Sequence, residues 1–187
     1  MHVLGISGSL RRDSHNKKLL RAAGEMLEAM GVRFELFDGL KAVPAYDDDD
    51  DLGAGPLPVA RMGEAVARAD AVLLATPEYN HSVPGQLKNA VDWLSRPAGS
   101  AALAGKPVAV VGASTGMFGA VWAQAELRKA LAAAGARVAE GEVALGHADT
   151  RFDEQGRLND PDVHDQLGAA VEALVDEAAR TMATLAA

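Results

Sequence analysis

The chain of 187 residues carries 18 Lys and Arg against 26 Asp and Glu, a formal net charge of −8 at pH 7. This balance argues against a general nucleic-acid or membrane-surface binder, because both need clusters of basic side chains. The 49% hydrophobic and 24% charged content is ordinary for one globular domain with a sizeable core. The chain has no cysteine, which excludes disulfides and thiolate catalysis and fits a reducing cytoplasm.

Short apolar runs alternate with longer amphipathic segments along the chain. The pattern predicts strands over residues 2–7, 33–37, 71–75, 107–112 and 137–144, and helices over 16–30, 59–69, 84–95, 120–134 and 161–185. Repeated strand–helix alternation with continuously apolar strands indicates a parallel sheet covered by helices on both faces. Five strands fit a single flavodoxin-like, doubly wound α/β domain over residues 1–187, with strand order 2-1-3-4-5.

One segment, residues 107–125, is long enough to span a bilayer and has no charged side chain. Its Gly, Ser, Thr and Gln residues are unfavourable in lipid, so we expect a strand, a glycine-rich turn and a helix instead. The N-terminal apolar run lacks preceding basic residues and is interrupted by Gly5 and Ser7, which indicates a strand and not a signal peptide. We therefore expect a cytoplasmic protein without a membrane partner.

The first predicted strand runs directly into a polar loop, Gly8-Ser9-Leu10-Arg11-Arg12-Asp13-Ser14-His15-Asn16, which precedes a helix. Free backbone N–H groups and the helix dipole favour an anion at such a position. Arg11 adds a guanidinium suited to phosphate oxygens. Ser14 or Asn16 can alternatively serve only as the helix cap, but a cap requires neither Arg11 nor Ser9. The loop matches neither the P-loop nor the dinucleotide fingerprint.

The segment after the third predicted strand carries the most specific pattern, and residues 76–93 read TPEYNHSVPGQLKNAVDW. Pro77 stiffens the backbone, and Tyr79 offers a flat face. Glu78 and Asn80 offer hydrogen-bonding groups. Open α/β sheets bind ligands at the carboxyl ends of strands, so this loop suits a flat heterocycle with polar edges. For Glu78 we favour a hydrogen-bond acceptor that fixes its loop over a general acid.

A third loop, Gly112-Ala113-Ser114-Thr115-Gly116, follows the fourth predicted strand and matches the G-x-S-x-G pattern of serine hydrolases. A hydrolase would use Ser114 as nucleophile, with a histidine base and an acid drawn from His147, His164, Asp149 and Asp153. The match is short, and a turn rich in Gly and Ser suits a ligand loop equally well. A serine-hydrolase function also assigns no role to the other two loops, so it is the less favoured alternative.

The three loops follow the first, third and fourth strands, which meet beside the switch point of a 2-1-3-4-5 sheet. One loop suits a phosphate, and the other two flank space for a flat ring. The sequence therefore predicts a site for a mononucleotide with a large heterocycle, and FMN is the obvious candidate. We expect no metal site: His81 has no second ligand nearby, and the run Asp47 to Asp51 is typical of a solvated loop.

These motifs resemble those of the NADPH-dependent FMN reductases, a flavodoxin-like family that includes quinone reductases, chromate reductases and azoreductases. The resemblance covers residues 2–145 and rests on residues 8–16, 77–93 and 112–119. It implies FMN as cofactor and NADPH or NADH as reductant. It implies hydride transfer to flavin N5 and then to a quinone or another small-molecule acceptor, in ping-pong order. Because the cofactor carries this chemistry, no catalytic side chain is implied.

The resemblance also assigns the cofactor-binding residues and an oligomeric state. It implies that the phosphate is held by Ser9, Arg11, Ser14, His15 and Asn16, and that the ring is lined by Pro77, Glu78, Tyr79, Asn80, Ser114 and Gly116. It further implies a homodimer or homotetramer. The alternative is a flavodoxin-type electron carrier, although the phosphate loop does not resemble that of flavodoxins and no second aromatic residue is well placed beside Tyr79.

Overall fold

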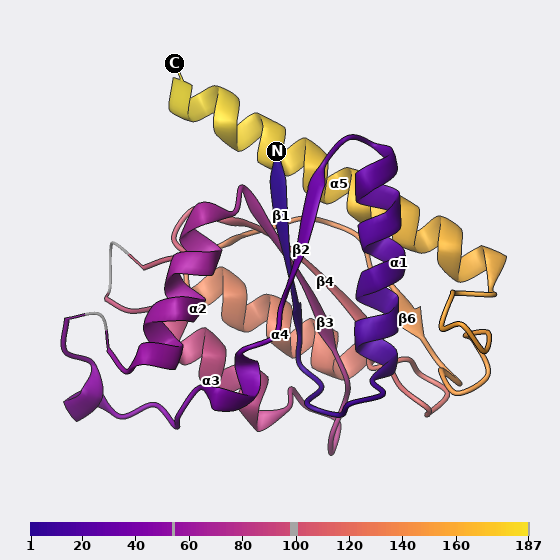
Figure 1. The fold of residues 1–187 in the computed structure, drawn as a ribbon, viewed down its shortest axis with the longest axis horizontal. Coiled ribbons are helices and arrows are strands. Elements are labelled where there is room, and N and C mark those ends of the chain that lie inside the picture. The colour runs from indigo at the N-terminus through magenta and orange to yellow at the C-terminus, as the bar shows by residue number, and fades with distance from the viewer. Residues whose placement is uncertain (54, 98–100, 187) are drawn as a thin grey trace.

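The computed structural model describes residues 1–53, 55–97 and 101–186 of the chain. Strands lie in the order β2-β1-β3-β4-β5, with β6 also paired to β4, and every strand pair is parallel (Figure 1). This confirms the predicted doubly wound sheet. The strands are β1 (His2–Ser7), β2 (Arg33–Phe37), β3 (Ala71–Thr76), β4 (Pro107–Ala113), β5 (Arg137–Val138) and β6 (Ala144–Leu145).

Helices cover both faces of the sheet, as the strand–helix alternation predicted. Helices α1 and α5 pack on one face, and α2, α3 and α4 pack on the other (Figure 1). No described helix has the length and apolarity needed to cross a membrane. The helices are α1 (His15–Ala29), α2 (Leu57–Arg68), α3 (Gly85–Leu94), α4 (Val121–Ala133) and α5 (Pro161–Ala186), with short 3-10 turns at Leu40–Ala42 and Asp48–Asp50.

The two faces of the sheet are filled by alternate residues of the central strands. Leu73 and Val111 pack against α1 and α5, whereas their neighbours Leu74 and Val110 pack toward α2, α3 and α4. Strands β3 and β4 are buried along their whole length. Because both faces are covered, these strands read as continuous apolar runs in the sequence, which is why their bounds were predicted to within one residue.

The prediction of one continuous strand over residues 137–144 is wrong. Strand β5 pairs with the start of β4, and β6 pairs with its end. Residues 139–143 between the two short strands form a bulge. The Arg128 guanidinium of α4 donates to two carbonyl oxygens of the bulge, those of Ala139 (2.9 Å) and Gly141. It also donates to the carbonyl oxygen of Val110 in β4, at 3.0 Å. Arg128 thus donates to a β4 carbonyl that a continuous fifth strand would otherwise pair.

We predict that Arg128→Met lowers the free energy of unfolding by about 2 kcal/mol, because it leaves carbonyl oxygens of the bulge without their donor. Urea unfolding measures the loss. Lys129→Met, at the exposed neighbouring position, should change the free energy of unfolding by less than about 0.5 kcal/mol. Equal effects of the two substitutions would contradict the role given to Arg128.

Candidate functional site

The loops after β1, β3 and β4 come together at the carboxyl edge of the sheet, drawn lowest in Figure 1. A cleft of about 350 Å³ lies between the first two loops. Its lining residues are Gly8, Leu10 and Arg11 from the first loop, with Tyr79, Pro84, Gly85 and Gln86 from the second loop and the start of α3. Pro84 to Gln86 were not predicted as site residues, although they lie in the same motif, where its helix begins.

The first loop presents unpaired backbone donors. Ser14 is the N-cap of α1, since its Oγ accepts the N–H of Lys17. The backbone N–H groups of residues 10–16 make no hydrogen bond within the part of the chain that the structure describes. Ser9 is buried, and the Arg11 side chain is exposed at the cleft. Free N–H groups at a helix start beside a guanidinium are the groups that an anion needs.

His15, the first residue of α1, is held beside the cap. Its ring stacks on that of Phe152, with the centroids 6.0 Å apart. Burial, followed by the charges of Lys18 and Arg11, lowers the pKa of His15 and favours the neutral ring. Lys18 lies 2.9 Å from the Asp13 carboxylate, and this hydrogen bond holds the pKa of Asp13 below its usual range. No pattern in the sequence predicted the contact between His15 and Phe152.

Asn16 links the first loop to the end of β4. Its side chain is buried, and its Nδ2 donates to the Ala113 carbonyl oxygen at 2.9 Å while its Oδ1 accepts the Ala113 N–H at 3.0 Å. The side-chain amide therefore pairs with one residue of β4 as a neighbouring strand would. Both polar atoms of this predicted phosphate residue face the strand, and its backbone N–H remains free.

The second loop is a tight hairpin turn. Tyr79 and Ser82 exchange two backbone hydrogen bonds, of 3.2 and 3.1 Å. Between them, Asn80 and His81 both have positive φ, 52° and 59°, which is the requirement of a type I′ turn. Asn suits this backbone, but glycine is strongly favoured at the position of His81. Two backbone hydrogen bonds therefore close this turn, in addition to the stiffening expected from Pro77.

Glu78 connects the second loop to α4. Its side chain is 12% exposed, and its Oε2 accepts the backbone N–H groups of Trp122 and Ala123, both at 3.1 Å. The residue before α4, Ala120, has a φ of 65° and no side chain that can cap the helix. Glu78 supplies this cap from another loop, which is the hydrogen-bond acceptor role that we favoured for it.

The third loop is backed closely by the chain after β6. A Cβ on Gly146 would lie 2.2 Å from the Met117 carbonyl oxygen, and one on Gly119 would lie 2.2 Å from the Ala144 carbonyl carbon. Both glycines are therefore required for the close approach of the two segments. Within this loop, the Ser114 Oγ accepts the N–H of Gly116 at 3.1 Å, and Gly116 is exposed.

The arrangement does not form a serine-hydrolase triad. Among the described residues, no histidine side chain makes a hydrogen bond with Ser114. His147 uses its backbone N–H to bond the Gly116 carbonyl oxygen. His164 lies at the start of α5 and lines a separate hollow together with Glu25 of α1 and Asp153. The described residues therefore do not pair Ser114 with a histidine base, as a serine hydrolase requires.

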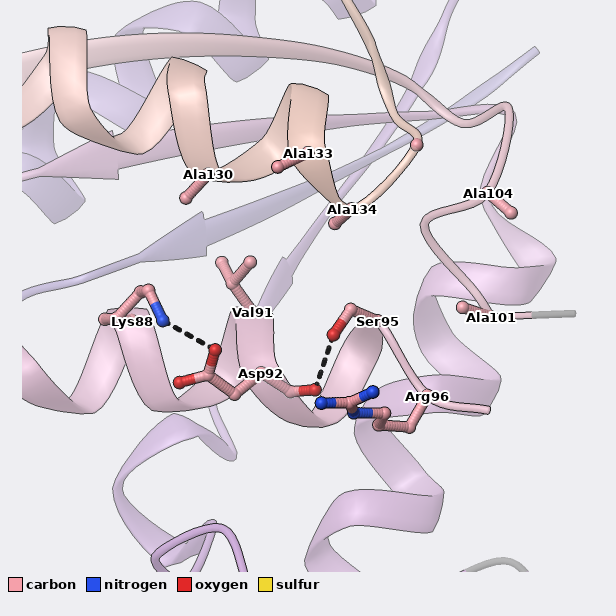
Figure 2. A pocket seen from close by; sticks show the side chains of 11 residues that line it. Lys88, Val91, Asp92, Ser95, Arg96, Ala101, Ala104, Ala130, Ala133 and Ala134 are labelled. Carbon is pink, nitrogen blue, oxygen red and sulfur yellow. Dashed lines mark hydrogen bonds and ion pairs between the residues drawn. The ribbon is translucent and has the colours of Figure 1, made fainter. Parts of the chain in front are cut away.

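A larger hollow, of about 590 Å³, lies away from this edge, between α3 and the C-terminal end of α4 (Figure 2). Five of its eleven lining residues are alanines, and it also contains a Lys88–Asp92 pair of 2.6 Å and Ser95, whose Oγ donates to the Asp92 carbonyl oxygen. The segments before β4 and β5 line it, so it lies at the amino edge of the sheet. Ligands of open α/β sheets bind at the opposite edge, and the smaller cleft is therefore the better candidate.

We predict that Asn16→Ala lowers the free energy of unfolding by about 2 to 3 kcal/mol, since it leaves both backbone groups of Ala113 without partners in the core. Chemical denaturation measures the change. Arg21→Ala, at an exposed position of the same helix, is the matched control and should have little effect. An Asn16→Ala protein as stable as the wild type would show that the link to β4 contributes nothing.

The chain is similar to flavin-dependent reductases. The model of the NADPH-dependent FMN reductase family matches residues 1–150. An NAD(P)H-dependent FMN reductase of Pseudomonas aeruginosa is 42% identical over 173 residues, 92% of either chain. A quinone reductase of Pseudomonas putida is 39% identical over 159 residues, 84% of either chain. The solved structure of the flavoenzyme NAD(P)H:(acceptor) oxidoreductase from Paracoccus denitrificans has a TM-score of 0.85 and 36% identity, covering 96% of this chain and 98% of that one. The chain therefore belongs to the NADPH-dependent FMN reductase family, as its motifs predicted.

Proposed function

We propose that the protein is an FMN-dependent NAD(P)H oxidoreductase, formed by one flavodoxin-like domain, whose acceptor is a quinone or a similar small molecule. The observation that carries the proposal is the cleft that joins the Arg11 loop to the Tyr79 turn, beside the free N–H groups of residues 10–16. The relatives named as an FMN reductase and a quinone reductase support it.

The phosphate of FMN would lie at the start of α1. The free N–H groups of residues 10–16 would be available to donate to it, and Arg11 would pair with its charge. Ser9 and Ser14 contribute hydroxyl groups. The buried Nδ1 of His15 has no hydrogen-bond partner in the described part of the chain, so a bound phosphate oxygen can satisfy it. Asn16 would act through its backbone N–H, since its amide holds Ala113.

The flavin ring would lie between the second and third loops. The second loop contributes Pro77, Tyr79 and Asn80, with Glu78 holding this loop on α4, and the third contributes Ser114 and Gly116. Bound FMN supplies the redox chemistry, taking a hydride from NADPH or NADH and passing it to the acceptor. The protein binds and orients both substrates and excludes water. Backbone N–H groups at the ring edge would stabilise negative charge on the ring.

We also propose that the protein is a homodimer or homotetramer of the cytoplasm. Four large apolar side chains beside the site are between 40% and 64% exposed: Tyr79, Met117, Phe118 and Trp122. A second copy that covers them would shield both this surface and the ring of the flavin from water. The absence of cysteine from the chain is in keeping with a reducing compartment.

We predict that Arg11→Gln raises the Kd for FMN by about tenfold and leaves the Kd for riboflavin unchanged, because only FMN carries the phosphate that Arg11 binds. Quenching of flavin fluorescence measures both constants. Arg21→Gln, on the exposed face of α1, should change neither. An equal loss for the two flavins would show that Arg11 does not contact the phosphate.

The reaction itself is tested by initial rates with NADPH or NADH and a benzoquinone at several concentrations of each. We predict parallel double-reciprocal lines, because the two substrates would occupy the same face of the flavin in turn. Intersecting lines would contradict alternate binding. If the protein binds FMN but does not oxidise either nicotinamide, it is an electron carrier and the proposed activity is wrong.

A further inference from the structure

We infer that Glu78 is a positioning residue that sets the spacing between the two loops on either side of the flavin ring. The inference rests on the proposed function, since the ring is its ligand. Together with His81 and Ser82, Glu78 forms a clasp: three side chains that reach from the second loop to the first turns of α4.

Glu78 makes the central contact of the clasp. Its Oε2 accepts two consecutive N–H groups of α4, those of Trp122 and Ala123, at 3.1 Å each. Because Ala120 provides no side-chain cap, Glu78 satisfies donors that the helix start would otherwise expose. Ser82 adds a second contact, since its Oγ donates to Glu126 Oε2 at 2.5 Å.

His81 occupies a position of the turn where glycine is favoured. Its φ of 59° is unfavourable for a residue with a side chain. Its ring lies edge-on to Trp122, with centroids 4.7 Å apart, and its Nδ1 lies 3.6 Å from Glu78 Oε1. Trp122 packs in the same way on Phe118 of the third loop, with centroids 5.0 Å apart. The His81 ring is 76% exposed, so it adds a contact at the edge of the clasp, while Glu78 makes the central one.

The consequence of the clasp follows from the order of the chain. Helix α4 (Val121–Ala133) begins directly after the third loop, which carries Ser114 and Gly116. A clasp that fixes the second loop to the first turn of α4 therefore fixes the second loop relative to the third. The loop at the start of α1 takes no part in these contacts. Loss of the clasp should weaken binding of the ring and leave binding of the phosphate unchanged.

The experiment compares Glu78→Ala with Glu78→Gln, using FMN and riboflavin as probes. We predict that Glu78→Ala raises the Kd for both flavins by the same factor, about tenfold, because both carry the same ring. Glu78→Gln retains an oxygen that accepts both N–H groups, so it should bind both flavins within about twofold of the wild type. The visible absorption band of bound FMN should change shape in the alanine variant only.

The controls separate this inference from the proposed function. Glu172→Ala, on the exposed face of α5, should bind both flavins like the wild type. If Glu78→Ala does not fold, Glu78→Asp replaces it, because the shorter carboxylate cannot reach both donors. Wild-type affinity of a folded Glu78→Ala protein, or a loss confined to FMN, would overturn the inference. Failure of the wild type to bind either flavin would instead overturn the proposed function.

Discussion

The paired hydrogen bonds between the Asn16 side chain and the Ala113 backbone hold the candidate site together at its base. Strand β3 lies between β1 and β4 in the sheet, so strand pairing alone does not bring the loops after β1 and β4 together. The amide of Asn16 supplies one donor and one acceptor, as a backbone does, and seats the first turn of α1 on the end of β4. The start of α1 thereby keeps its free N–H groups beside the cleft.

Glu78 makes the equivalent link between the second loop and α4. The two links share a property: each uses a polar side chain within a ligand motif to satisfy backbone groups of another element. Neither side chain is then free to move with the ligand, so the loops are held in place before FMN binds. A site prepared in this way loses less conformational entropy on binding than a set of mobile loops.

The sequence predicted most element bounds because these depend on local apolar periodicity and on helix caps, and it predicted the sheet order because strand–helix alternation is typical of the doubly wound fold. It did not predict the break between β5 and β6, since Arg128 acts from a helix that is distant in the sequence. It identified Asn16 as a polar residue of the phosphate loop, but the contact with Ala113 depends on the folded sheet. It also missed the type I′ turn, because His81 stands where glycine would have signalled it.

The central claim is that this protein binds FMN at the carboxyl edge of the sheet, with the phosphate at the start of α1 and the ring between the second and third loops, and reduces it with NAD(P)H. An absorption spectrum of the purified protein under argon, taken before and after addition of FMN and then of NADPH or NADH, tests it most directly. We predict a bound yellow chromophore that bleaches when the nicotinamide is added. A protein that binds no FMN, or whose bound FMN neither nicotinamide bleaches, would contradict the account.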